Sequence, residues 1–279
     1  MLDVTTAYGL TYLFPAGDSV VGPSLRTYGE FARPEADLIS HYLGHNGDKA
    51  TFIDVGANIG AICLPIAARN PGSTVIALEA QRRIHAILSA NALNNRLLNV
   101  ECHHMAAGSR DGLADFPSIS LDVARNFGDV GIGVANAQSI LESVQMRKLD
   151  SLPSDRVGVI KIDVQGAELD VLQGATTLIS RDRPVLFIEI TRTATEATAR
   201  VAEFVKGLGY SLFFFYSTFA TPRSEKKSAV EPTLRGDYSL VALPSVDMNH
   251  LGLPPFEAAD AEWPREIRYF QYLKTYGFR

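Results

Sequence analysis

The segment of residues 51–60, TFIDVGANIG, joins a buried strand to a helix through a glycine turn. Its first five residues are mostly β-branched or aromatic, and residues 61–69 carry helical spacing. The glycines therefore fall where a parallel sheet meets its crossover helix, which is where α/β proteins bind cofactors. Gly56 and Gly60 let backbone N–H groups approach a ligand, and Asp54 at the strand end can accept hydrogen bonds. The segment predicts a site for a ligand with both a cationic and an anionic group.

The spacing within this segment separates two kinds of nucleotide site. The dinucleotide site of a dehydrogenase has the pattern G-x-G-x-x-G, with the pyrophosphate on the helix, whereas this chain has D-x-G-x-x-x-G. Asp54 replaces the first glycine of that pattern, and its anion repels a pyrophosphate but attracts an ammonium group such as that of S-adenosylmethionine. The segment therefore indicates a methyl-donor site and disfavours a nicotinamide-dependent oxidoreductase.

A second acid supports the same interpretation. Glu79 ends the apolar strand expected at residues 74–78, about 20 residues beyond the glycines, where an acid can hold the hydroxyl groups of a ribose. The alternative is that Glu79 only caps the helix expected at residues 82–94. With Asp54 and two glycines upstream, we favour the cofactor role.

Length, charge and cysteine content limit the possible classes of protein. A chain of 279 residues is within reach of one α/β domain, and its net charge of −5, without a basic block, makes nucleic acid an unlikely partner. Cys63 and Cys102 fall inside an expected helix and strand, which indicates two buried thiols rather than a disulfide or a zinc site. Neither a leader nor a membrane span is evident. We expect a soluble, unprocessed cytoplasmic enzyme that does not bind membranes.

Strands and helices alternate from residue 51 onward, which predicts an α/β fold with about seven strands in a mostly parallel sheet and helices on both faces. Residues 1–48 form an expected N-terminal appendage that serves as a cofactor or substrate lid. Residues 49–244 form the ligand-binding domain, in which an insertion at 108–149, rich in glycine, supplies substrate-facing loops. Residues 245–279 form an aromatic tail that docks on the domain or makes a homodimer contact.

Several motifs in this order resemble the FkbM-type S-adenosylmethionine-dependent methyltransferases, a family with the Rossmann-like class I methyltransferase fold. The resemblance covers residues 22–191. The motifs are YGE at 28–30, FIDVGANIG at 52–60, VIALE at 75–79, NFG at 126–128 and IKIDVQGAE at 160–168. The glycine segment is common to most methyltransferases, whereas the block at 160–168 is quite specific.

The resemblance implies a set of contacts to the methyl donor. The set comprises residues around the methionine part of the donor, an acid that holds the ribose, and two residues after the third strand that lie near the adenine. For His104, an equally favoured interpretation is that it is only a half-exposed histidine at the end of a strand. The expected donor contacts are Glu30, Asp54, Gly56, Asn58, Gly60, Glu79, His104, Met105 and Asp163.

Two carboxylates at strand ends are the expected catalytic residues. Asp163 ends the strand expected at 157–164, where the transferred methyl group should sit, and is the first candidate for the base or for orienting the acceptor. Glu189, on the next strand, is the second, and Glu168 and Asp122 are weaker candidates. Asp163 and Glu189 could instead hold one divalent cation that lowers the pKa of a hydroxyl acceptor.

One departure from the family concerns Gln165, where the family usually has glutamate. The change removes a charge beside Asp163 and puts any role that needs an acid there in doubt. It also leaves open the alternative that the chain is a relative of these enzymes that binds the donor without turnover and acts as a scaffold.

The acceptor is the least constrained part of the prediction. The resemblance favours O-methylation of a hydroxyl on a sugar, a glycan or a natural product. The chain has no N-P-P-Y or D-P-P-Y sequence, which argues against methylation of exocyclic amines. A carboxyl group of a peptide or small acid is an alternative acceptor, because it is already ionised near neutral pH.

Overall fold

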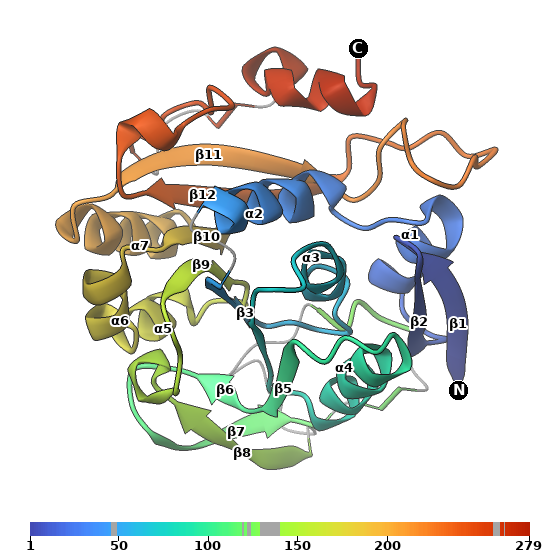
Figure 1. Ribbon diagram of the computed structural model, residues 1–279, viewed down its shortest axis with the longest axis horizontal. Coiled ribbons are helices and arrows are strands. Elements are labelled where there is room, and N and C mark those ends of the chain that lie inside the picture. The colour runs from blue at the N-terminus through green and yellow to red at the C-terminus, as the bar shows by residue number, and fades with distance from the viewer. Residues whose placement is uncertain (46–48, 119, 122–123, 129–139, 259–262, 265) are drawn as a thin grey trace.

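A seven-stranded sheet forms the centre of this computed structural model, as the sequence predicted (Figure 1). The structure describes residues 1–45, 49–118, 120–121, 124–128, 140–258, 263–264 and 266–279. Neighbouring strands run parallel except at β12, which is antiparallel to both β10 and β11. Across the sheet the strands are β11 (Ser211–Thr218), β12 (Gly236–Leu243), β10 (Val185–Ile190), β9 (Val157–Ile162), β3 (Thr51–Val55), β4 (Val75–Glu79) and β5 (Val100–His104).

The strand order contains a point where the chain reverses its direction across the sheet. Numbered along the chain, the seven strands lie in the order 3-2-1-4-5-7-6, so the reversal falls between β3 and β9. In open α/β sheets, ligands bind outside the carboxyl ends of the strands at such a point. Asp54 on β3 and Asp163, directly after β9, both lie at this place.

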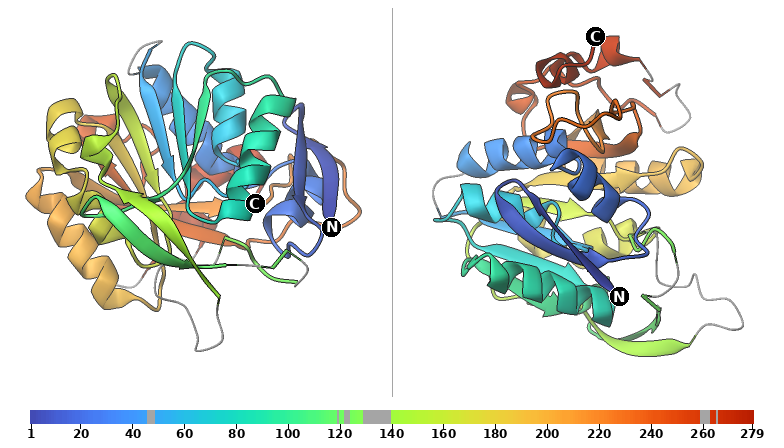
Figure 2. Two further views of the ribbon diagram at one scale, coloured as in Figure 1. Left: turned by 90° about the horizontal axis from the view of Figure 1, so that it is seen from below. Right: turned by 90° about the vertical axis from the view of Figure 1, so that its right-hand side faces the viewer.

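Helices cover both faces of the sheet (Figure 2). Crossovers that lead from β3 to β5 place their helices on one face, and crossovers that lead from β9 to β11 place theirs on the other, because such connections are right-handed. With both faces covered, β3, β4 and β9 are buried along their whole length. No helix in the described part of the chain is long and apolar enough to span a membrane. The helices are α2 (Arg33–His45), α3 (Cys63–Arg69) and α4 (Arg82–Asn94), then α5 (Glu168–Gln173), α6 (Thr176–Asp182) and α7 (Thr195–Gly207).

Two short helices follow β9, and Gly174 lies between α5 and α6. A Cβ at this position would overlap the carbonyl oxygen of Gly108, so the chain passes too closely for a side chain. The break between the helices therefore lies where the chain contacts the segment that follows β6 (Ala106–Ala107).

The N-terminal residues form a hairpin and an additional helix. Strands β1 (Leu2–Ala7) and β2 (Leu10–Pro15) pair antiparallel, and the Asn91 side chain on α4 holds β2 through hydrogen bonds of 2.7 and 3.0 Å to Leu13. Helix α1 (Val21–Tyr28) was not predicted. Its Gly22 and Pro23 lower helix propensity, although proline is tolerated in a first turn.

The insertion expected to form loops contains a second sheet. Strand β8 (Leu141–Arg147) pairs antiparallel with β7 (Gly112–Pro117) and parallel with the short strand β6. Val144 and Met146 alternate with exposed residues, which is the pattern of a strand with one covered face. Strands β7 and β8 therefore occupy part of the insertion, and its role in facing the substrate stays a prediction.

The aromatic tail packs on β11 and β12, as one of the two expected arrangements. The Tyr272 ring stacks on Phe215 with the ring centres 5.2 Å apart, and the Tyr272 hydroxyl donates a 2.6 Å hydrogen bond to the Tyr216 carbonyl. Trp263 lies 5.5 Å from Phe214 between ring centres and is buried. The homodimer contact through this tail stays a prediction.

Both cysteines are free thiols, as the sequence indicated. Cys63 is fully buried at the start of α3, and Cys102 is half-buried on β5. Burial raises the pKa of both thiols, which keeps them protonated near neutral pH. Neither thiol is therefore activated as a nucleophile.

Candidate active site

A cavity of about 320 Å³ opens at the carboxyl ends of β3, β9 and β10. This volume is in the range of pockets that hold small ligands. Five residues predicted from the sequence line it, and they come from three strand ends and the glycine turn. These are Asp54, Gly56, Asn58, Asp163 and Glu189.

Asp54 is the deepest acid of this cavity. Only 1% of it is exposed, and neither carboxylate oxygen accepts a hydrogen bond from an N–H or O–H group of the described residues. Burial raises the pKa of Asp54, while Lys161, whose Nζ lies 3.8 Å from Oδ1, opposes that effect. A buried acceptor that makes no hydrogen bond costs free energy, so Asp54 is prepared for a ligand that brings a donor or a cation.

Lys161 joins Asp54 to Asp163. Its buried ammonium group makes a 2.9 Å hydrogen bond to Asp163 Oδ2. Burial by itself would lower the pKa of Lys161, but Asp163 and Asp54 raise it, so the ammonium stays charged. Burial likewise opposes ionisation of Asp163, but Lys161, together with the hydrogen bonds from Glu189 and Gln165, outweighs that effect and lowers the pKa of the Asp163 carboxyl. Asp163 is therefore an ionised, weakly basic acceptor.

Glu189 is the partner of Asp163 across the cavity. Burial, followed by the negative charge of Asp163, raises the pKa of Glu189 well above its usual range. The Gln165 amide nitrogen lies between the two acids, 2.9 Å from Glu189 Oε2 and 3.4 Å from Asp163 Oδ1. The pair therefore shares one proton, which resides on Glu189 when Asp163 is ionised.

The arrangement gives no support to a divalent cation between Asp163 and Glu189. The Lys161 ammonium and the Gln165 amide already donate to these carboxylates, and a bound cation would have to displace both. Among the described residues, three metal-ligating side chains gather in one other place only, at His41, His45 and His250.

A second, smaller cavity of about 50 Å³ lies beside the first, on the other side of Gly56. Glu79 and Met105, both predicted donor contacts, line it together with the buried Phe116 of the second sheet. Gly56 and Asp163 line both cavities, so the two are neighbouring compartments. An acid beside a narrow, mostly apolar slot suits a ribose and a flat base.

The Glu79 carboxylate holds the chain around this slot. Its Oε2 accepts a 2.9 Å hydrogen bond from the Asn58 backbone N–H, and its Oε1 accepts a 2.7 Å bond from Gln81 N–H. Burial raises the pKa of Glu79 to about 7 despite these bonds. Each carboxylate oxygen can accept a further hydrogen bond, so two hydroxyl groups can still be bound.

Gly56 has a structural reason for its position. Its φ is +86°, and a Cβ there would overlap the backbone oxygen of Asp163. The glycine therefore permits the close approach of the β3 turn to the end of β9, in addition to lining both cavities.

Three predicted donor contacts do not line these cavities. Gly60 turns inward, where a Cβ would collide with Leu64, so it serves the packing of α3. The His104 imidazole Nε2 lies 3.1 Å from the Ala80 carbonyl rather than in the slot. The remaining one is Glu30.

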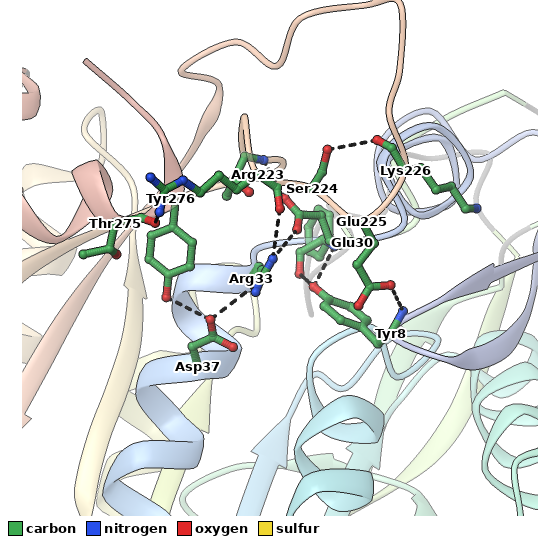
Figure 3. A network of polar contacts seen from close by, with 12 residues as sticks. Tyr8, Glu30, Arg33, Asp37, Arg223, Ser224, Glu225, Lys226, Thr275 and Tyr276 are labelled. Atoms are coloured by element: carbon green, nitrogen blue, oxygen red, sulfur yellow. Dashed lines mark hydrogen bonds and ion pairs between the residues drawn. The ribbon is translucent and has the colours of Figure 1, made fainter.

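Glu30 belongs to a polar network that joins α2 to the loop after β11 and to the tail (Figure 3). The Glu30 carboxylate is fully buried, accepts a 2.6 Å hydrogen bond from Thr221 N–H and lies 3.6 Å from the Arg33 guanidinium. Arg33 in turn lies 3.5 Å from Asp37, which also contacts the Tyr276 hydroxyl and the Arg69 guanidinium. The structure therefore gives Glu30 a role in holding segments together.

One of the two weaker catalytic candidates, Glu168, does not line the cavities of the site. Glu168 Oε1 accepts a 2.8 Å hydrogen bond from Gly166 N–H at the start of α5, so it caps that turn. Asp122 lies outside the described residues.

A third cavity, of about 450 Å³, continues from the first toward the tail. The two share Glu189, Thr191, Gly236 and Asp237. The third cavity is also lined by the aromatic side chains of Tyr216, Tyr238 and Phe270, by aliphatic side chains, and by Arg192 and Glu266. Glu189 therefore stands where a polar cavity meets an aromatic one. Sequence reasoning missed the residues from β12, because that strand returns to the site from far along the chain.

The strand order and the acids at the strand ends define a class I methyltransferase fold. The profile of the methyltransferase FkbM domain matches residues 54–212, more than half of the chain. The chain therefore belongs to the FkbM methyltransferase family, as the motifs indicated.

Two curated proteins are similar to part of the chain. The AMB antimetabolite synthetase AmbE of Pseudomonas aeruginosa is 29% identical over 160 residues, which are 45% of this chain and 8% of that protein. Methyltransferase 1 of Beauveria bassiana is 25% identical over 146 residues, which are 46% of this chain and 59% of that protein. The chain thus matches less than two thirds of the length of either relative.

Solved structures of methyltransferases are also similar. Methyltransferase FkbM from Methylobacillus flagellatus KT aligns over 70% of this chain and 44% of its own, with 17% identity and a TM-score of 0.44. The N-terminal domain of human METTL16 aligns over 85% of this chain and 77% of its own, with 13% identity and a TM-score of 0.46.

Proposed function

We propose that this chain transfers the methyl group of S-adenosylmethionine to a hydroxyl oxygen of a sugar, glycan or natural-product acceptor. The observation that carries the proposal is the position of Glu189, whose carboxyl group lines both the polar cavity and the aromatic one. An acceptor in the aromatic cavity would present its hydroxyl group beside Glu189, and aromatic rings pack well against sugar and natural-product rings.

The charge of the polar cavity supports S-adenosylmethionine as the donor. Asp54 and Asp163 face one buried cation, Lys161, so their ionised forms leave an excess of negative charge. The sulfonium and ammonium groups of the donor offset this excess, and the ammonium supplies the hydrogen bonds that Asp54 lacks. Asn58 lines the same cavity, and Glu79 and Met105 line the slot for the ribose and adenine.

The two acids then have different tasks in the reaction. Methyl transfer from a sulfonium is an in-line displacement, so the enzyme aligns the acceptor oxygen and removes its proton. Asp163 is held ionised by Lys161 and is a weak base, which suits it to accept a hydrogen bond and orient the acceptor. Glu189 carries the shared proton in the free protein, and the positive charges of the bound donor favour its loss to solvent; once ionised, Glu189 is the stronger base of the two and takes the proton of the acceptor hydroxyl.

The experiment that tests this function has two stages. Calorimetric titration with S-adenosylmethionine and S-adenosylhomocysteine, with NAD as a control, establishes the donor site. Release of S-adenosylhomocysteine is then measured with a panel of hydroxylated acceptors. Glu189→Gln should lower kcat far more than donor affinity, whereas Glu101→Gln, an exposed acid-to-amide change on β5, should alter neither. Donor binding by the parent protein without turnover of any acceptor would favour the scaffold alternative.

A carboxylate acceptor is the second candidate, and two arginines support it. Arg235 lines the polar cavity and Arg192 lines the aromatic one, so a carboxylate could find a cation at either. A carboxylate needs no base because it is already ionised. Under this alternative, Glu189→Gln would retain kcat, and Arg192→Gln would raise KM.

A further inference from the structure

Three of the six histidines of the chain meet on the surface, away from the cavities described above. His41 and His45 lie one turn apart on α2, and His250 follows β12 in the chain. Their ring centres are 4.2 Å apart for His41 and His45, and 5.5 and 5.6 Å from each of these to His250. One ring nitrogen from each histidine falls in a group whose members all lie within 4.8 Å of one another.

The segment that carries His250 is fixed to α2 by other contacts. The Tyr42 hydroxyl, on the turn between His41 and His45, donates a 3.0 Å hydrogen bond to the Met248 carbonyl. The Asn249 side chain closes the following turn through hydrogen bonds of 2.8 and 3.0 Å to the Leu253 backbone. The convergence of the three rings therefore follows from the packing of two elements that are far apart in sequence.

The hydrogen bonding of His45 also favours a metal ligand. His45 Nδ1 lies 2.9 Å from the His41 carbonyl, and because a carbonyl only accepts, Nδ1 carries a proton and Nε2 is the ring nitrogen that can bind a metal. Metal-binding histidines usually donate their other ring N–H in this way.

We propose that His41, His45 and His250 bind one divalent transition-metal ion of the zinc, cobalt or nickel type. Three neutral imidazoles suit these ions, and a set of three histidines leaves a fourth position for water. Their nitrogens already lie within 4.8 Å of one another, and binding of one ion would draw the three rings closer together. The bound ion would join α2, which packs on the sheet beside the donor cavity, to the segment that leads into the aromatic tail.

The test uses the untagged full chain, so that no added histidines bind the metal. Titration with Zn²⁺ and with Co²⁺ should show that the protein binds one equivalent of either ion. Bound Co²⁺ should also show the visible absorption that is typical of cobalt with few ligands, most of them nitrogen. His250→Ala should weaken binding by more than about tenfold, the loss that outer partners of a metal site alone already cause. His103→Ala, a histidine on β5 outside the cluster, is the matched control and should bind as the parent does.

A second measurement shows whether the ion bridges the two elements. Zn²⁺ should raise the Tm of the parent and of His103→Ala but not that of His250→Ala, because only a ligand bound to the folded arrangement stabilises it. Equal Tm values of the metal-free proteins would show that His250→Ala folds. The proposal is overturned if the parent binds no metal, if His250→Ala binds as tightly as the parent, or if His103→Ala loses binding equally.

Discussion

The ionisation of Glu79 gives a sharp test of the donor site. Burial raises the pKa of this carboxyl to about 7 in the free protein, even though two backbone N–H groups donate to it. Ribose hydroxyls donate to the ionised form, and a proton on the carboxyl takes up one of the positions that would accept them. Binding of S-adenosylmethionine should therefore compete with protonation of Glu79.

The magnitude follows from the pKa. The apparent dissociation constant is the intrinsic one divided by the fraction of protein in the ionised form. With a pKa of about 7, that fraction is roughly one tenth at pH 6 and roughly nine tenths at pH 8, so affinity should rise by about tenfold, or ~1.4 kcal/mol, between these values. The sign is set by the raised pKa: affinity improves as pH rises through 7 and then levels off.

The assay is calorimetric titration with S-adenosylhomocysteine and S-adenosylmethionine at several pH values from 6 to 8. Glu79→Gln is the matched control, because it removes this titration while the ionisations of the ligand remain. The variant should bind more weakly than the parent at pH 8, by roughly tenfold to a hundredfold, the range of hydrogen bonds to a charged group. The affinity of the variant should change with pH only because of ionisations of the ligand itself. The assignment of Glu79 to the ribose would be refuted if the affinity of the parent protein did not depend on pH, or if it fell with rising pH for both ligands.

Three further variants test the fold around the site. Glu35→Gln should increase the free energy of unfolding at pH 8 by up to ~3 kcal/mol and leave it unchanged at pH 4, as measured by urea unfolding at both pH values. The reason is that burial raises the pKa of Glu35 to about 7 in the folded protein, so this carboxyl ionises at lower pH in the unfolded chain than in the folded one. Gly56→Ala should cost several kcal/mol in the same assay, because its Cβ would overlap a backbone oxygen. Asn91→Ala should cost about 3 kcal/mol and make the β1–β2 hairpin sensitive to protease, because three hydrogen bonds to β2 and the β3 turn are lost.

The central sheet and the acids of the site could be predicted because both depend on short stretches of sequence. Buried parallel strands appear as apolar runs, and an acid at the end of such a run is placed at the ligand edge by the strand itself. Asp54, Glu79, Asp163 and Glu189 all satisfy this rule, and all four line a cavity.

The remaining parts of the site depend on contacts between distant segments. Strand β12 inserts between β10 and β11, and this topology, rather than any local pattern, brings Arg235 and Asp237 to the polar cavity. Gly60 and His104 occur in the expected sequence positions, but the direction of the backbone turns one toward α3 and the other toward Ala80. Sequence spacing places a residue near a site and does not decide which way it faces.

Gln165 shows how the structure changes the meaning of a substitution. In the sequence, an amide where the family usually has an acid suggests the loss of a functional carboxylate. In the structure, this amide supplies hydrogens to Glu189 and Asp163, which would otherwise be two neighbouring acids with too few donors between them. A third carboxylate here would add repulsion to a pair that already shares a proton. Gln165 therefore keeps Glu189 directed toward the junction of the polar and aromatic cavities, and the role that we propose for Glu189 needs no acid at position 165.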